Sequence, residues 1–228
     1  MERITSRKNE YIKSLRANCS GDYICDGLKM LEEAESAGVE ITSILWKENP
    51  GEHSCPVQYV APADLFDYAS PMKNSPGPVF TVRPPEFDVK QISSAIILEN
   101  VQDPGNVGTV IRTAYALGID CVYLLGDCAS LHNTKTIRAS SGAIFKQRIV
   151  LNELPELPFY AAVLADDALE IGKVSLKNAA VAIGSEGHGL SDELIAKSAG
   201  KVIIPMQPGS ESLNAAIAAS LFMWEMKR

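Results

Sequence analysis

The stretch SAIILENVQDPGNVGTVIRTAYALGIDCVYLL, residues 94–125, decides the fold of the chain. It begins with a short apolar run at 94–98, passes through a polar loop rich in proline and glycine, and continues as a helical pattern. A second apolar run follows at 120–125. Apolar runs of this length that end in turn residues are typical of buried strands. The order strand, helix, strand therefore predicts two parallel strands in one sheet.

The same unit recurs through the rest of the chain. Further apolar runs of the buried-strand type are FYAAVL (159–164), AAVAI (179–183) and KVIIP (201–205). The helical patterns between and after them are TKTIRASSGAIF (134–145), LSDELIAKSAG (190–200) and SLNAAIAASLFMWEM (212–226). This alternation predicts an α/β fold in which a parallel sheet is covered by helices on both faces.

The pattern of residues 1–88 indicates a separate, small α/β unit. The segment 28–38 spaces its apolar side chains for one helix face and ends in a glycine that suits a helix cap. Shorter strand and helix patterns lead up to an apolar strand at 79–82. Pro84 and Pro85 then break regular structure, which predicts a linker near 84–91. We therefore expect two domains, residues 1–88 and 89–228.

The composition is that of an ordinary globular chain, with 46% hydrophobic and 21% charged residues among 228. No apolar run approaches the roughly 20 residues that cross a bilayer. The first residues, MERITSRKNEYIKSLR, lack the apolar region of a secretory signal. We therefore expect a cytoplasmic protein.

The cysteines indicate neither a disulfide framework nor a metal site. Their number is odd and no C-x-x-C pair occurs. The nearest approach to a ligand cluster, Cys25 with His53 and Cys55, lacks the fourth ligand of a structural zinc site. The five cysteines are Cys19, Cys25, Cys55, Cys121 and Cys128.

The formal net charge of −7 is unfavourable for nucleic-acid binding, which depends on Lys and Arg at phosphates. The charge is unevenly distributed, because residues 1–16 contain five basic side chains and two acidic ones. On charge alone, a basic arm for RNA and an ordinary solvated helix both remain open. The basic residues of this segment are Arg3, Arg7, Lys8, Lys13 and Arg16.

Three loops of the second part are candidates for chemistry, because parallel sheets bind ligands beyond the carboxyl ends of their strands. The first loop is ENVQDPGNVGTVIR (99–112). Its proline and glycines permit a tight turn, and Asn106 is able to cap the helix that follows. A turn followed by a helix cap and a surface arginine would explain the glycines of this loop. It does not explain why Arg112 lies among apolar neighbours.

The second loop is IGSEGHGLSDEL (183–194), whose glycines do not follow the dinucleotide-binding pattern G-x-G-x-x-G. Ser191 suits the N-cap of a helix, and His188 is expected to be an exposed loop residue. A turn alone does not require an acidic side chain such as Glu186 between its glycines. An acidic side chain just beyond a buried strand suits a hydroxyl or amine rather than a phosphate.

The third loop, IPMQPGSESLNAAIAAS (204–220), leads from a strand into a strongly apolar helix. Taken alone, it is explained by Ser212 as a helix cap and by Asn214 as a polar residue of the first turn.

Together the three loops resemble, in order and spacing, the three motifs of the SpoU branch of the knotted RNA methyltransferases. The resemblance spans residues 95–226 and includes ASSGAIF (139–145) between the motifs. Residues 1–88 resemble more faintly the L30e-like RNA substrate-binding domain of these enzymes, although Ile24-Cys25-Asp26-Gly27 stands where that domain has Leu-Glu-Gly. The matching residues are Asn106, Gly108 and Arg112 in the first motif, Gly184, Glu186, Gly187 and Gly189 in the second, and Ile204, Pro205, Met206, Ser212, Leu213 and Asn214 in the third.

The resemblance implies a SPOUT trefoil-knot domain that uses S-adenosyl-L-methionine to methylate a ribose 2′-hydroxyl in structured RNA. The cofactor-binding residues that it implies are Gly184, Ile204, Met206 and Leu213, with the backbone beside Ser212. The catalytic residues that it implies are Arg112, Asn106, Glu186, Ser212 and Asn214. Because arginine is ordinarily never deprotonated in proteins, we expect Arg112 to hold an RNA phosphate and stabilise the developing alkoxide.

The resemblance also implies a homodimer formed through the last helix, although a buried core helix explains its apolar end at 221–226 equally well. The added first domain favours ribosomal over transfer RNA, and nothing identifies the nucleotide. A catalytically silent RNA-binding protein of the same fold is the alternative, against which the five catalytic-type residues argue. A dinucleotide-dependent oxidoreductase lacks support, because its glycine pattern is missing after the first strand.

Overall fold

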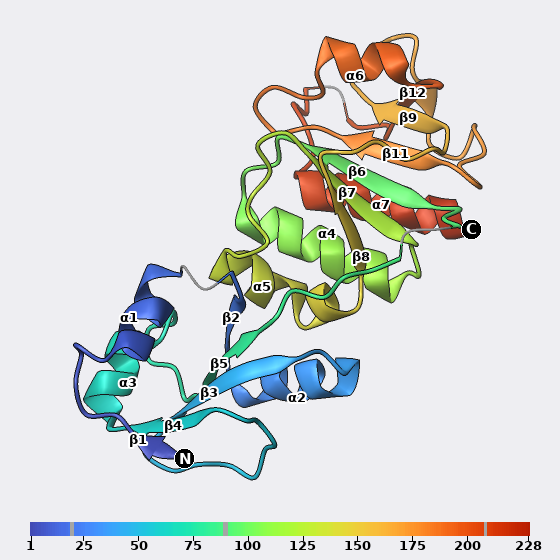
Figure 1. Cartoon of the computed structure of the whole chain (residues 1–228). Coiled ribbons are helices and arrows are strands. Elements are labelled where there is room, and N and C mark those ends of the chain that lie inside the picture. The colour runs from blue at the N-terminus through green and yellow to red at the C-terminus, as the bar shows by residue number, and fades with distance from the viewer. Residues whose placement is uncertain (19–20, 89–90, 208) are drawn as a thin grey trace. The chain divides into compact units, whose positions relative to one another are not determined.

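The chain folds around two separate sheets, one of five strands and one of seven (Figure 1). The computed structural model describes residues 1–18, 21–88, 91–207 and 209–228. Contacts divide the chain into one unit of Met1–Glu86 with Leu131–Lys146, and another of Phe87–Ser130 with Gln147–Arg228. Cys19 and two residues of the expected linker, Val89 and Lys90, lie outside the described residues. The division into domains 1–88 and 89–228 stays a prediction.

Every pair of neighbouring strands in the seven-stranded sheet of the second unit is parallel, as the sequence predicts. The strand order is β10-β12-β9-β11-β6-β7-β8. Two strands, β8 and β10, were not predicted: β10 has only two residues, and none of the four residues of β8 is fully buried. The strands are β6 (Ala95–Glu99), β7 (Cys121–Leu125), β8 (Arg148–Leu151), β9 (Phe159–Ala162), β10 (Leu169–Glu170), β11 (Ala180–Ile183) and β12 (Gly200–Ile203).

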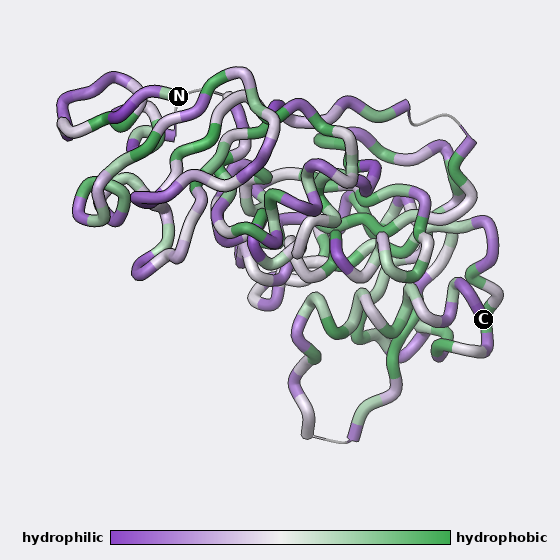
Figure 2. The backbone as a smooth tube through the Cα atoms, turned by 90° about the horizontal axis from the view of Figure 1, so that it is seen from below, coloured by the Kyte–Doolittle hydropathy of each residue, from purple (hydrophilic) through white to green (hydrophobic). Residues whose placement is uncertain are grey.

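Helices cover both faces of this sheet, which confirms the second part of the prediction. Leu194 of α6 (Asp192–Lys197) packs with the side chains that one face presents, such as Ile97 and Ala182. The helices α4 (Pro104–Ala116) and α7 (Ala215–Lys227) pack against each other and against β7 and β11 on the other face (Figure 1). Hydrophobic and hydrophilic stretches alternate along the backbone (Figure 2). Among the described residues, no helix is long and apolar enough to span a membrane.

The helix expected over 134–145 is shorter than predicted. It ends as α5 (Thr134–Ser140), and a separate 3-10 turn follows at Ala143–Phe145. Ser141 and Gly142 between them have φ values of 50° and 87°, in the left-handed region that ends an α-helix. Glycine adopts this conformation without steric cost, so the sequence SSG stops the helix although the apolar pattern continues.

The five-stranded sheet of the first unit has the order β1-β4-β3-β5-β2 and contains both parallel and antiparallel pairs. The expected helix at 28–38 is α2, which ends at Gly38 in the left-handed conformation. The strand expected at Val79–Val82 is β5. The other strands are β1 (Glu2–Arg3), β2 (Tyr23–Asp26), β3 (Ile41–Lys47) and β4 (Gln58–Ala61), and the helices are α1 (Glu10–Ala17), α2 (Leu28–Ala37) and α3 (Ala63–Ala69).

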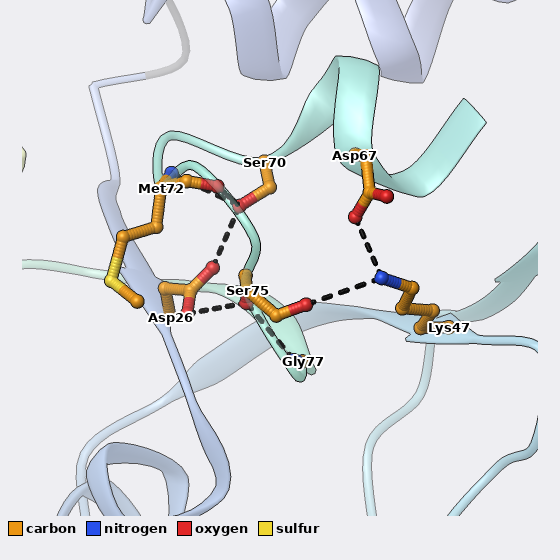
Figure 3. Close-up of polar contacts among 7 residues, drawn as sticks. All are labelled: Asp26, Lys47, Asp67, Ser70, Met72, Ser75 and Gly77. Atoms are coloured by element: carbon orange, nitrogen blue, oxygen red, sulfur yellow. Dashed lines mark hydrogen bonds and ion pairs between the residues drawn. The ribbon is translucent and has the colours of Figure 1, made fainter. Parts of the chain in front are cut away.

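Asp26, which stands where the L30e-like domain has the glutamate of Leu-Glu-Gly, stabilises a turn of the first unit. Its carboxylate accepts hydrogen bonds from the hydroxyls of Ser70 and Ser75, at 2.9 and 2.7 Å (Figure 3). Lys47 pairs with Asp67 at 2.7 Å beside it. These contacts hold the turn between α3 and β5 against the end of β2. A longer side chain is therefore not needed here to fix this turn.

The cysteines that the structure describes are four free thiols. Cys121 lies buried in β7, and burial raises the pKa of its thiol to about 11. A thiol with so high a pKa is protonated at neutral pH and is a poor nucleophile or metal ligand. Within the described ranges, no three His, Cys, Asp or Glu side chains gather in an arrangement suited to a metal ion.

Candidate active site

The first two loops meet because their strands are neighbours in the sheet. β6 and β11 pair in parallel, with Leu98 opposite Ile183, so both strands end at the same edge. The chain leaves β6 toward β7 on one side, whereas β11 lies on the other. This reversal of direction is the topological switch point at which open parallel sheets bind ligands. The loop after β6 therefore faces the loop that carries Glu186.

Three predicted residues form one hydrogen-bonded network at this edge. Glu186 Oε1 accepts from Asn106 Nδ2 at 3.0 Å and from Asn214 Nδ2 at 2.8 Å. The same Asn214 amide donates to Asn106 Oδ1 at 2.9 Å, and the backbone N–H of Ala215 reaches Glu186 Oε1 at 3.3 Å. The network joins all three loops. An ionised carboxylate that accepts several N–H groups is held in one position, which pre-organises the site.

Asn106 does not cap its helix, contrary to the prediction. The N-cap of α4 is Asp103, whose side chain accepts from the backbone N–H of Asn106 at 2.8 Å, and Pro104 follows at the first helical position. Asn106 therefore lies inside the first turn, where its own amide is free to bond Glu186. Proline is favoured at the first helical position, so the sequence D-P carried this information.

In the third loop the helix cap also differs from the prediction. Asn214, not Ser212, is the N-cap of α7, and its Oδ1 accepts from the backbone N–H of Ala216 at 3.0 Å. Its Nδ2 remains available for Asn106 and Glu186. One side chain thus starts the last helix and completes the network. Ser191 caps α6 as predicted.

Arg112 and Ser212 are not part of this network. Arg112 is exposed on α4, and its guanidinium forms no hydrogen bond or ion pair with any residue that the structure describes. Ser212 is exposed at the rim of the neighbouring cavity. An uncompensated guanidinium on the helix that carries Asn106 is available to an anionic ligand.

A cavity of about 480 Å³ lies beside the network, at the carboxyl ends of β9, β11 and β12. This volume lies in the range of small-molecule and cofactor sites. All four residues expected to bind the cofactor line it, together with Glu186 and Ser212. The four are Gly184, Ile204, Met206 and Leu213.

Gly184 is required by the tight turn that forms one wall of this cavity. Ser185 and Gly189 pair as an isolated bridge, with the Gly189 N–H donating to Ser185 O at 2.9 Å. A β-carbon at Gly184 would overlap the backbone of Gly189 and the nitrogen of Leu190. The glycine therefore lets two backbone segments approach closely, which places the Glu186 loop over the strand ends.

A second cavity of about 430 Å³ adjoins the first and was not foreseen from the sequence. The two cavities share Ser185, Glu186 and His188. His188 is an exposed loop residue, as expected, and it also lines both cavities. Asn100, directly after β6, lines this cavity; it has a φ of 55° and its side chain accepts from the Asp127 N–H at 2.8 Å. Most of the remaining lining comes from the segment that leads from β6 into α4, and the lining residues of this segment are Asn100, Val101, Gln102, Asp103 and Asn106.

The sheet, the cavity at its carboxyl edge and the network beside it define an α/β protein built to bind a small ligand next to a polar reaction site. The model of the SpoU rRNA Methylase family matches residues 93–224. The chain belongs to this family and is an RNA methyltransferase of the SpoU type. The resemblance found in the three loops is thereby confirmed.

Relatives and solved structures of this family resemble the whole chain. The 23S rRNA (guanosine(2553)-2′-O)-methyltransferase RlmP of Bacillus subtilis is 26% identical, with 100% of both chains covered. The crystal structure of an RNA 2′-O ribose methyltransferase is 26% identical, with a TM-score of 0.79 over 98% of this chain and 97% of that one. The AdoMet-bound rRNA methyltransferase of Sinorhizobium meliloti shares the fold at 22% identity, with a TM-score of 0.86 over 99% and 97%.

Proposed function

We propose that this chain methylates a ribose 2′-hydroxyl of structured RNA, with ribosomal RNA favoured over transfer RNA and S-adenosyl-L-methionine as the methyl donor. The observation that carries the proposal is the network of Asn106, Glu186 and Asn214 at the rim of the 480 Å³ cavity. Two similar proteins of matching length also support the proposal. The Bacillus subtilis relative is a 23S rRNA 2′-O-methyltransferase, and the similar crystal structure is that of an RNA 2′-O ribose methyltransferase.

The cavity fits the cofactor. Ile204, Met206 and Leu213 offer apolar surface for a flat adenine ring, and Gly184 allows the backbone to approach the ligand. When bound, S-adenosyl-L-methionine supplies a methyl group on a positively charged sulfur. In the trefoil knot expected for this family, backbone groups of the second and third motifs grip the cofactor, and residues of both motifs line this cavity.

The remaining residues of the site bind and orient the RNA substrate. A ribose hydroxyl is a weak nucleophile until its proton is removed or its developing charge is stabilised. Arg112 binds an RNA phosphate and stabilises the developing alkoxide, since its guanidinium stays charged. Glu186, fixed by Asn106 and Asn214, orients the ribose hydroxyls, and Ser212 contributes a further hydroxyl at the rim. Residues 1–88 serve as the L30e-like RNA-binding domain and 89–228 as the methyltransferase domain.

Transfer of a labelled methyl group to total RNA from cells that lack this gene tests the proposal. We expect label on one ribosomal nucleotide, and that nucleotide should resist alkaline hydrolysis, because a methylated 2′-oxygen no longer cleaves the backbone. Label on an alkali-sensitive nucleotide would show base methylation and contradict the 2′-O assignment. Neither label nor cofactor binding would favour the catalytically silent RNA-binding protein.

A second copy of the chain is the partner that α7 fits best. Ile217, Leu221 and Trp224 are 52%, 41% and 63% exposed and lie one helical turn apart, so they form an apolar stripe on the solvent side of α7. We expect the unaltered protein to be a homodimer in light scattering. Leu221→Glu with Trp224→Glu should halve the mass, whereas Leu169→Glu, at an equally exposed leucine of β10, should not. Equal masses for all three would contradict the α7 interface.

A further inference from the structure

Two arginines of the first unit share one tyrosine ring. The guanidinium carbon of Arg7 lies 4.6 Å from the centre of the Tyr68 ring, and that of Arg16 lies 5.0 Å from the same centre. Arg7 precedes α1 and Arg16 lies in its last turn, whereas Tyr68 belongs to α3, which packs against α1 (Figure 1). All three side chains are exposed. We call them the Arg7–Tyr68–Arg16 cluster.

The arrangement holds two positive charges close together without a compensating carboxylate. Neither guanidinium forms an ion pair with any carboxylate of the described ranges. Two neighbouring acids are engaged elsewhere, Glu10 with Lys13 and Asp67 with Lys47, each at 2.7 Å. Like charges repel, so the pair is stabilised when an anionic ligand binds both guanidinium groups.

The contact with the ring leaves the donors of both arginines available. An arginine stacks on an aromatic ring through its face, whereas its five N–H groups point outward in the guanidinium plane. Arg16 uses one of them for the backbone carbonyl of Tyr68, at 3.3 Å. The ring and this bond restrict both side chains, so less conformational entropy is lost when they bind a ligand. The fork of N–H donors matches the oxygens of a phosphate.

We propose that the Arg7–Tyr68–Arg16 cluster is a binding site for the phosphate backbone of RNA. The inference rests on the proposed function, because that function supplies RNA as the polyanion. It also explains how a chain of net charge −7 binds RNA, since the positive charge is concentrated where neighbouring carboxylates do not cancel it. We expect the cluster to contact backbone phosphates and therefore to bind RNA independently of its base sequence.

Filter binding of in-vitro-transcribed 23S rRNA fragments at several salt concentrations tests the site. Arg7→Gln/Arg16→Gln should weaken binding about tenfold near 0.1 M salt and reduce the slope of log K against log salt by about 1.4 to 1.8, the value for two lost phosphate contacts. Tyr68→Leu keeps both charges and should weaken binding less, whereas Tyr68→Phe should restore it. Cofactor binding should not change in the double variant, and thermal unfolding should shift only slightly, because both arginines are exposed and lose only surface contacts with Tyr68.

The matched control is Arg83→Gln/Lys173→Gln, which removes the same net charge from two exposed cations paired with Glu40 and Glu170. It should retain the affinity and the salt slope of the unaltered protein. Equal affinities and slopes for the cluster variant and the unaltered protein would overturn this inference alone. An equal loss in the control would also overturn it, because net charge rather than the cluster would then be responsible. No RNA binding by the unaltered protein would overturn the proposed function as well.

Discussion

Replacement of Arg112 by alanine is expected to lower methyl transfer to RNA about 100- to 1,000-fold while leaving S-adenosyl-L-methionine binding unchanged. The guanidinium is exposed, forms no ion pair or hydrogen bond with the described residues, and does not line the cofactor cavity. Its removal therefore disturbs neither the fold nor the cavity. The lost interaction is one that strengthens as negative charge develops on the ribose oxygen, so the loss should appear in kcat.

Single-turnover transfer and calorimetric titration of the cofactor, both on the same preparation, measure the two effects. Arg228→Ala is the matched control, because Arg228 is an exposed arginine of the same unit that pairs with Glu225. Asn106→Ala should also abolish transfer, because Glu186 loses one of its amide donors. A parallel loss of transfer and cofactor affinity in Arg112→Ala would contradict the assigned role.

The fold followed from the sequence where local pattern and burial agree. The apolar runs that became β6, β7 and β11 are strands with nearly every residue buried, and burial on both faces is what makes such runs continuous. The runs that became β9 and β12 are only partly buried. β1 and β10, with two residues each, and the half-exposed β8 carry no such pattern. Their existence depends on the neighbouring strand, which a local pattern does not contain.

The sequence predicted the residues that the structure brings together in the network, Asn106, Glu186 and Asn214, but it did not predict which side chains cap the helices. Asn106 and Ser212 both matched the chemistry of helix caps, yet Asp103 and Asn214 occupy the caps. The position of the helix start decides the cap: α4 begins at Pro104, directly after Asp103, and α7 begins at Ala215, directly after Asn214. Asn214 caps α7 through Oδ1 and bonds Glu186 through Nδ2, and this contact between distant loops is not contained in a local pattern. The position of His188 between two cavities likewise depends on the packing of two loops 80 residues apart, which no local pattern records.

Gly184→Ala is expected to lower the affinity for S-adenosyl-L-methionine about tenfold to 100-fold, through a cost of about 1–3 kcal/mol for forcing an extra carbon into packed backbone. The new β-carbon would overlap Gly189 and Leu190, and backbone atoms cannot rotate away as a flexible side chain does. The turn must open, which displaces the wall of the cavity and the carboxylate that Asn106 and Asn214 hold.

Gly187→Ala in the same loop is the matched control, because its β-carbon would meet nothing within 4 Å. Calorimetric titration of both variants should show weakened cofactor binding only for Gly184→Ala, accompanied by a lower melting temperature. Equal weakening in both variants would mean that the loop tolerates no side chain at all and that close backbone approach is not the reason for Gly184. Unchanged binding in both would remove Gly184 from the cofactor site, and the cavity beside Glu186 would then lack its expected ligand.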